Sequence, residues 1–117
     1  MTQTFVLDKA LILDRLGGDE EIFAMMVDLY LQDVDNYVLA LNAAVNSADA
    51  VVLSREAHTV KGLLATFSDD DGAEIAYTIE RQAKAGDLNG LSPLVTQLVQ
   101  SLRTLEAVLR SETGQVR

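Results

Sequence analysis

The sequence predicts an all-α protein, an antiparallel up-down four-helix bundle capped by a short N-terminal helix. Its 117 residues include one proline, seven glycines and few aromatic residues, a composition that favours helices over short strands. Apolar residues recur with a period of about 3.6 in stretches separated by short polar turns, as in amphipathic helices. The 49% hydrophobic content suits one packed core, so we expect a single domain over residues 1–117. Short connections between long helices place neighbours antiparallel.

The first two helices are expected over residues 5–16 and 19–45, with Gly17-Gly18 between them. Glycine tolerates the left-handed conformation that ends many helices. The carboxylates of Asp19-Glu20-Glu21 are favourable at the N-terminus of the next helix. The expected core-facing residues of this second helix are Phe23, Val27, Tyr30, Val34, Tyr37 or Val38, Leu41 and Val45.

A second apolar stripe covers only the first half of the 19–45 helix and consists of Ile22, Met26 and Leu29. Further along, the same face turns polar at Asp33 and Asn36. One interpretation is that the short first helix packs on this stripe. The other is that the stripe is a docking patch for another protein.

The third helix is expected over residues 49–67, with Ser47 or Asp49 as its N-cap. At about 100° per residue, its core stripe contains Leu53, Ala57, Val60, Leu64 and Phe67. His58, the only histidine of the chain, points away from this stripe. The residues around it on the polar side are Ser54, Lys61, Gly62 and Ala65.

The fourth helix is expected over residues 70–85, and Ser68 with Asp71 resembles a capping box in which Asp replaces Glu. Glu80 is placed to pair with Lys84 one turn further on. Its inward-facing residues are expected to be Ile75, Ala76, Ile79 and Ala83.

The last helix is expected over residues 91–110. Ser92-Pro93 resembles an N-cap followed by proline at the first helical position, although a start one turn earlier is also compatible with the sequence. The helical pattern is clearest here and consists of Leu94, Leu98, Leu102, Leu105 and Leu109.

Charge and composition exclude several functions. Nine basic and eighteen acidic residues give a net charge of -9, which disfavours binding to nucleic acid and to anionic membranes. The absence of cysteine excludes disulfides, thiol catalysis and cysteine-based zinc sites. No signal peptide is recognisable at Met1-Thr2-Gln3-Thr4 and no apolar run has membrane length, so the cytoplasm is the expected location.

Enzyme active sites find little support in the sequence. Ser54 lies one turn before His58, but nothing indicates the oxyanion hole or substrate cleft that a serine-type triad needs. A carboxylate-bridged metal site needs Glu three residues before His, and that position holds Arg55. Glycine-rich phosphate loops are absent as well.

The chemistry that remains is His58 acting as a nucleophile. An imidazole titrates near ~6.5, so at neutral pH an exposed one is mostly uncharged and offers a lone pair to an activated phosphoryl group. Lys61, three residues on, would offset the charge of the phosphate oxygens. Gly62 costs about 1 kcal/mol of helix stability relative to Ala but lets a partner come close. Each residue also has an ordinary interpretation: an inert histidine, a solvated lysine and a glycine at a helix contact. Their conjunction favours phosphate chemistry.

These residues resemble a known family. Ala57-His58-Thr59-Val60-Lys61-Gly62 is similar to the His-x-x-Lys-Gly signature of histidine-containing phosphotransfer (HPt) domains. Further similar segments extend over nearly the whole chain, at Leu16-Gly17-Gly18-Asp19-Glu20-Glu21, Tyr30-Leu31, Asp49, Ile79-Glu80 and Ala85-Gly86-Asp87-Leu88. The resemblance implies a phosphocarrier without kinase activity, in which His58 accepts a phosphoryl group from the aspartyl phosphate of one receiver domain and passes it to another.

The resemblance also implies roles for the neighbours of His58. Lys61 would be the cation at the phosphate and Gly62 the residue that gives steric clearance. The residues implied in receiver docking are Ile22, Met26, Leu29, Ser54 and Ala65, with Ile12 or Leu16 beside them. The chain departs from the family at Ser68, where glycine is common, and at Leu63-Leu64, where small residues or serine are common.

The partners implied by the resemblance are response-regulator receiver domains and a hybrid sensor kinase, and the protein is expected to be a monomer. No cofactor is expected on this chain, since the magnesium of the reaction is held by the receiver. Two other classes stay open: a helical scaffold that binds a response regulator without phosphorylation of His58, and a metal-dependent bundle enzyme. Kinase dimerisation domains also carry a helical phosphohistidine, but they are two-helix hairpins, and this sequence has more helices and no ATP motif.

Overall fold

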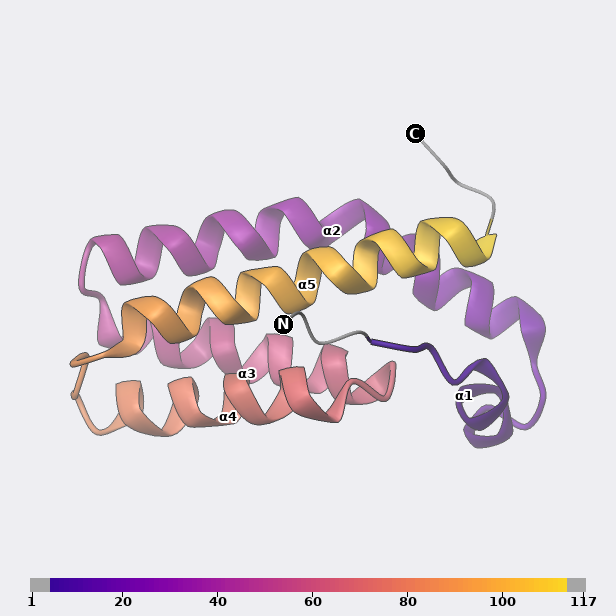
Figure 1. Cartoon of the computed structure of the whole chain (residues 1–117), viewed down its shortest axis with the longest axis horizontal. Coiled ribbons are helices and arrows are strands. Elements are labelled where there is room, and N and C mark those ends of the chain that lie inside the picture. Colours follow the sequence, from indigo (N-terminus) through magenta and orange to yellow (C-terminus); the bar gives the residue numbers. More distant parts are fainter. Residues whose placement is uncertain (1–4, 114–117) are drawn as a thin grey trace.

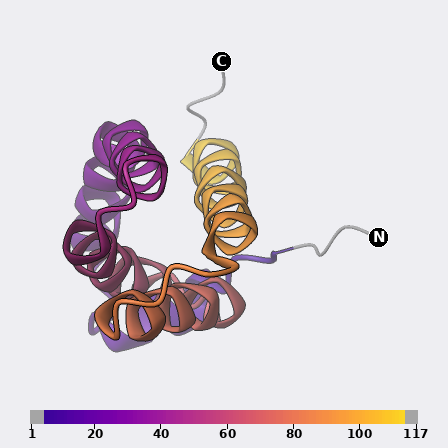
Figure 2. The ribbon, with the colours of Figure 1, turned by 90° about the vertical axis from the view of Figure 1, so that its left-hand side faces the viewer.

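The structure, a computed structural model, describes residues 5–113. This part of the chain contains no β-strand and forms five helices: α1 (Lys9–Arg15), α2 (Glu20–Asn46), α3 (Ala50–Thr66), α4 (Asp70–Lys84) and α5 (Leu91–Thr113). The prediction of an all-α fold is confirmed. Successive long helices reverse direction along the molecule, and α1 lies at the end where α2 begins (Figure 1). Viewed along the long axis, α2, α3, α4 and α5 follow one another around a shared interior (Figure 2).

Aspartate side chains decide where four of the helices begin. Their carboxylates accept hydrogen bonds from the first free backbone N–H groups, and the four capping residues are Asp8, Asp19, Asp49 and Asp69. The first helix is shorter than the expected 5–16, because Asp8 Oδ1 accepts from the Leu11 amide at 3.0 Å. The limits of α2, α3 and α4 differ from the expected ones by no more than one residue, whereas α5 continues beyond residue 110.

The turn between α3 and α4 differs from the expected capping box. Ser68 has a φ of 64°, in the left-handed region, and therefore closes the end of α3 instead of capping α4. The Asp69 amide donates to the Leu64 carbonyl at 2.8 Å, which is the hydrogen bond of a Schellman motif. The cap of α4 is Asp69, whose Oδ1 accepts from the Gly72 amide at 3.0 Å. The predicted pairing of Ser68 with Asp71 is thus wrong by one position.

Two other helix starts resolve alternatives that the sequence left open. Asp49, not Ser47, caps α3, because Ser47 donates its hydroxyl to the Ala43 carbonyl of the preceding helix at 2.8 Å. The last helix begins at Leu91, so Pro93 is its third residue. Proline is tolerated there because the first N–H groups of a helix have no partner within it.

One apolar core fills the interior between the four long helices. The α3 stripe is buried as expected, and so is the α5 stripe apart from Leu94, which is half-buried while Leu91 and Val95 are buried. On α2, Val38 is buried and Tyr37 only partly, which settles that alternative. Tyr30 is also buried: its ring packs edge-to-face with Phe67, and its hydroxyl donates to the Leu102 carbonyl at 2.8 Å. A buried phenol that keeps a hydrogen bond ties α2 to α5 without an unsatisfied polar group.

Within residues 5–113, no helix combines the length and the apolarity that crossing a membrane requires.

Candidate functional site

His58 lies on the outer face of α3, in the middle of the helix. The residues before and after it in the core stripe, Ala57 and Val60, are fully buried, so the backbone under the imidazole is held by packing. The His58 side chain itself is 66% exposed. The structure therefore presents the only histidine of the chain to solvent from a rigid support.

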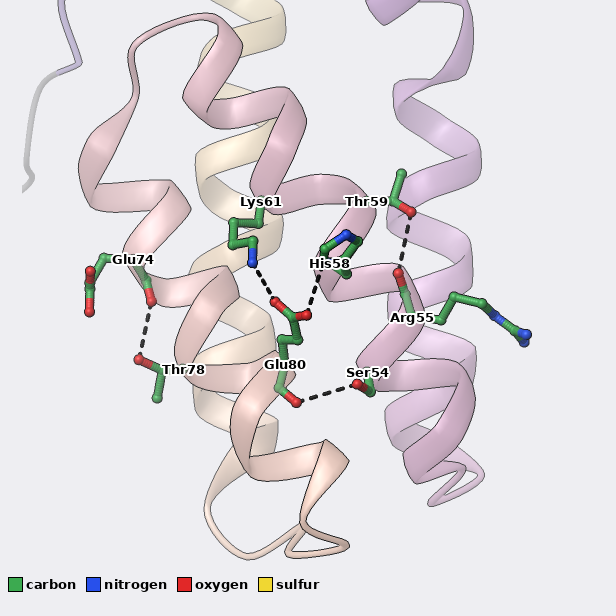
Figure 3. Close-up of polar contacts among 8 residues, drawn as sticks. All are labelled: Ser54, Arg55, His58, Thr59, Lys61, Glu74, Thr78 and Glu80. Atoms are coloured by element: carbon green, nitrogen blue, oxygen red, sulfur yellow. Dashed lines mark hydrogen bonds and ion pairs between the residues drawn. The ribbon is translucent and has the colours of Figure 1, made fainter.

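Glu80 of α4 reaches across to α3 and contacts both polar residues of the signature (Figure 3). Its Oε2 lies 2.8 Å from His58 Nδ1, and its Oε1 accepts from Lys61 Nζ at 2.7 Å. The Glu80 side chain is only 16% exposed, so these interactions are partly shielded from water. The expected pair of Glu80 with Lys84 is not found among the ion pairs of the described residues, because α4 packs on α3 and turns Glu80 towards it.

The protonation of this cluster follows from its hydrogen bonds. The Lys61 ammonium, with a smaller contribution from His58, holds the pKa of the Glu80 carboxyl below its usual range, although burial acts in the opposite direction. Glu80 is therefore ionised at neutral pH and can only accept hydrogen bonds. His58 Nδ1 must then carry the proton that is donated to Glu80. In the neutral ring this leaves the lone pair on Nε2.

Gly62 leaves open space beside the imidazole. A Cβ built on Gly62 has no atom of the described residues within 4 Å outside the backbone of its own helical segment. Gly72 shows the opposite case, since a Cβ there would lie 2.5 Å from Asp69 Oδ2. No helix contact within residues 5–113 requires a glycine at position 62, which favours the interpretation that the clearance serves an external partner.

Ser54 and Ala65 lie on the same side of α3 as His58 but in different settings. Ser54 is half-buried, and its hydroxyl donates to the Glu80 backbone carbonyl at 3.4 Å, so it fastens α3 to α4 (Figure 3). Ala65 is exposed, about two turns beyond His58. Their proposed part in partner binding stays a prediction.

The second apolar stripe of α2 is only partly covered. Met26 is half-buried and packs against the core, whereas Ile22 and Leu29 are 43% and 57% exposed. A surface hollow of about 320 Å³ lies between α1, α2 and α3 and is lined by Ile12, Arg15, Leu16, Met26, Ala65 and Thr66. The short helix lines this hollow but leaves Ile22 and Leu29 exposed, and the hollow extends from Met26 on α2 to Ala65 on α3. The docking interpretation stays a prediction.

Sequence reasoning missed the role of Glu80. On α4, Glu80 lies between the buried Ile79 and the exposed Arg81. An ordinary solvated glutamate could occupy this position, so the sequence of α4 does not indicate a role for Glu80. Only the pairing of α3 with α4 brings it to His58, and a single sequence does not give that pairing. The same holds for Tyr77, whose ring lies 5.1 Å from Lys61 Nζ.

In the described part of the chain, no group of three or more His, Cys, Asp or Glu side chains is arranged to hold a metal ion. The candidate site consists of the four residues described above, which are His58, Lys61, Gly62 and Glu80.

The described helices therefore define a class of site, in which an all-helical scaffold exposes one hydrogen-bonded imidazole beside a lysine and a glycine. Comparison with known proteins gives the family. The Hpt domain family matches residues 25–109, and the chain belongs to this family.

Individual proteins are similar to this chain in sequence or in fold. The phosphorelay protein LuxU of Vibrio harveyi is 26% identical over 100 residues, which cover 86% of each chain. The crystal structure of the histidine-containing phosphotransfer protein HptB from Pseudomonas aeruginosa has a similar fold, with a TM-score of 0.82, 22% identity and coverage of 95% of this chain and 96% of that one. The HPT domain of a sensor hybrid histidine kinase from Shewanella also has a TM-score of 0.82, with 17% identity and coverage of 94% and 95%.

Proposed function

We propose that this Hpt domain protein is a phosphorelay intermediate of a two-component system, with His58 as the residue that carries the phosphoryl group. One observation carries the proposal: the imidazole is exposed and its Nδ1 lies 2.8 Å from the ionised carboxylate of Glu80. This contact places a proton on Nδ1, which in the neutral ring leaves the lone pair on Nε2. The name of the Vibrio harveyi relative, a phosphorelay protein, supports the same function.

The first transfer step is an attack of His58 Nε2 on the phosphorus of an aspartyl phosphate. A P–N bond forms with the Nε2 lone pair, the P–O bond to the aspartate breaks, and the aspartate leaves as a carboxylate. The ring then holds both the phosphoryl group on Nε2 and the proton on Nδ1. The positive charge that develops on the ring is offset by Glu80, 2.8 Å from Nδ1. In the second step the carboxylate of another receiver attacks phosphorus, and Nε2 leaves with its electron pair.

Lys61 supplies the cation for the phosphoryl oxygens. It lies one helical turn after His58, and its ammonium is already held 2.7 Å from Glu80 Oε1, on the His58 side of α4. A phosphoryl group on His58 attracts this ammonium more strongly than a single carboxylate does, because it carries the larger negative charge. We therefore propose that the Lys61 ammonium turns from Glu80 to the phosphoryl oxygens when His58 is phosphorylated.

The partners we propose are receiver domains of response regulators and a hybrid sensor kinase. The family indicates a phosphotransfer carrier rather than a kinase, and we propose that the chain has no kinase activity of its own. The magnesium of the reaction would belong to the receiver, so this chain would need no cofactor. We further propose that it acts as a monomeric antiparallel four-helix bundle, capped by α1, in the cytoplasm.

We propose that the receiver docks over Gly62 and the apolar surface of α2. Ile22 and Leu29 are exposed, and the hollow beside Met26 and Ala65 continues that surface towards His58. An apolar patch next to a nucleophile suits a partner that must bring its aspartyl phosphate to Nε2.

The test is phosphoryl transfer from a purified receiver domain that carries radiolabelled phosphate, with every receiver of the source organism tried in turn. We expect the wild-type protein to acquire an acid-labile, base-stable label, as a phosphohistidine does, and His58→Gln to acquire none. Because the His58 side chain is mostly exposed, His58→Gln should unfold at the wild-type temperature. Equal labelling of the variant would refute the role of His58, and receiver binding without any labelling would indicate a scaffold.

A further inference from the structure

Tyr77 is a polar aromatic residue of α4 that the proposed chemistry leaves without a role. The residue is 42% exposed and lies three positions before Glu80 on α4. Two cations lie over its ring: Lys61 Nζ at 5.1 Å from the ring centroid and the Arg81 guanidinium carbon at 5.5 Å. Both distances are within the range of cation–π attraction. The Tyr77 ring is therefore a binding surface for the cations of Lys61 and Arg81.

We infer that Tyr77 is a positioning residue, which holds the Lys61 ammonium where the phosphoryl group of His58 needs it. The inference rests on the proposed function, because only phosphate on His58 gives Lys61 a task. Lysine has a flexible four-carbon stem, and an ammonium without fixed partners samples many rotamers. Two partners from α4, the Glu80 carboxylate and the Tyr77 ring, restrict Lys61 before the phosphate arrives.

The two partners act differently when phosphate is present. Glu80 is negatively charged and therefore competes with the phosphoryl group for the Lys61 ammonium. The Tyr77 ring is uncharged, so it attracts the cation through its quadrupole without neutralising it. Lys61 can then leave the carboxylate for the phosphoryl oxygens while it stays close to the ring. Tyr77 thus lowers the entropy cost of ordering Lys61 for the transfer step. It does not compete with the phosphoryl group for the Lys61 ammonium.

The first experiment compares Tyr77→Leu with Tyr77→Phe in transfer from a phosphorylated receiver that labels the wild-type protein. Leucine removes the ring, whereas phenylalanine keeps it and removes only the hydroxyl. We expect the rate constant at saturating receiver to fall about two- to fivefold in Tyr77→Leu and to stay at the wild-type value in Tyr77→Phe. The half-saturating receiver concentration should not change in either variant. A change confined to that concentration would make Tyr77 a docking contact and overturn the inference.

The second experiment asks whether Tyr77 acts through Lys61. Tyr77→Leu is introduced into a Lys61→Met background, in which the stem remains but the charge is gone. We expect no further loss of rate from Tyr77→Leu in this background, since the cation it positions is missing. An equal loss in both backgrounds would show that Tyr77 acts on folding or on another group, and would overturn the inference.

A third measurement does not depend on phosphoryl transfer. The ε-methylene protons of Lys61 should show an upfield ring-current shift in the NMR spectrum of the wild-type protein and of Tyr77→Phe. This shift should disappear in Tyr77→Leu. If the wild-type protein shows no such shift, Tyr77 does not hold Lys61 and the inference fails. Failure of wild-type labelling, by contrast, would refute the phosphorelay function whatever the ring-current shift.

Discussion

In the described part of the chain, two polar clusters each contain a glutamate whose two carboxylate oxygens accept hydrogen bonds from two different side chains. Glu80 of α4 accepts hydrogen bonds from His58 and Lys61 of α3, one on each carboxylate oxygen. Glu106 Oε1 accepts from Arg103 at 3.0 Å and Oε2 from Arg110 at 3.1 Å, both on α5, and Arg103 also donates to Asp35 of α2 at 2.5 Å. The two glutamates are equally sheltered, with 16% and 18% of their side chains exposed.

The difference between the clusters lies in what the glutamate binds. A guanidinium group is always protonated and has no free lone pair, so it can form an ion pair but cannot act as a nucleophile. An imidazole has a second nitrogen, and fixing a proton on one nitrogen leaves a lone pair on the other. A glutamate with two partners is therefore part of a structural ion-pair network on α5, but it is part of a candidate nucleophilic site on α3. The following predictions test this contrast, from the largest expected effect to the smallest.

The largest effect is expected where the His58 cluster is open to a partner. Gly62→Leu should reduce transfer to His58 about a hundredfold, because a side chain beside the imidazole displaces the incoming phosphorus from its attack geometry. The same change should stabilise the isolated protein by up to about 1 kcal/mol, since leucine is a better helix former and meets open space. Rates of transfer and thermal unfolding measure the two effects.

The matched control for Gly62→Leu is Thr104→Leu, an exposed position next to Arg103 in the other cluster. It should leave transfer unchanged. Wild-type transfer in Gly62→Leu would show that no partner approaches over this position.

Replacement of the glutamate in each cluster should show most directly that only the His58 cluster takes part in transfer. Glu80→Ala should slow transfer roughly thirtyfold, because Nδ1 loses the charged acceptor that fixes the proton and balances the phosphorylated ring. Glu106→Ala should leave the rate at the wild-type value. Single-turnover transfer kinetics of both variants provide the measurement. Similar losses in both would mean that the glutamates act only through stability.

Loss of the lysine should have a smaller effect. Lys61→Ala should slow transfer about tenfold without unfolding the protein, because one charge-assisted interaction with the phosphoryl oxygens is lost. Arg110→Ala, which removes a cation from the other glutamate, is the control and should transfer normally. An unaffected rate in Lys61→Ala would show that the cation beside His58 is incidental.

The smallest effect concerns the dependence of stability on pH. The pKa of Glu80 is lowered in the folded protein, so its contribution to stability is present above the unfolded pKa of about 4.3 and is lost as the pH falls through the folded value. Wild-type protein should exceed Glu80→Gln in free energy of unfolding by less than about 1 kcal/mol near neutral pH. Urea unfolding at several pH values should show this difference shrinking below about pH 4. A difference that grows as the pH falls below about 4 would contradict the assignment.

The sequence predicts the core of this fold better than its turns. Apolar stripes such as Leu53, Ala57 and Val60 are set by the helical period, and the structure buries them. The start of α4 depended instead on the left-handed conformation of Ser68, which moved the capping role to Asp69. A backbone conformation of this kind is uncommon for serine, and no pattern of side chains indicated it.

Part of the candidate site could also be predicted from the sequence, and part could not. His58, Lys61 and Gly62 share one helix, so their spacing already placed them together. Glu80 and Tyr77 come from another helix, and the spacing rule within α4 pointed to Lys84 as the partner of Glu80. In the structure Glu80 instead contacts His58 on α3. Burial of Ala76, Ile79 and Ala83 fixes the rotation of α4 about its axis, and with this rotation Glu80 faces α3. Packing of two helices, rather than the pattern of either, completes the site.

The hydrogen bond between His58 Nδ1 and Glu80 has a consequence for the energetics of a relay. The proton it holds need not move in either transfer step, so loading and unloading of His58 are the same exchange run in opposite directions. Such a carrier does not itself set the direction of phosphoryl transfer. The direction would depend on the stabilities of the two aspartyl phosphates and on the concentrations of the two phosphorylated receivers.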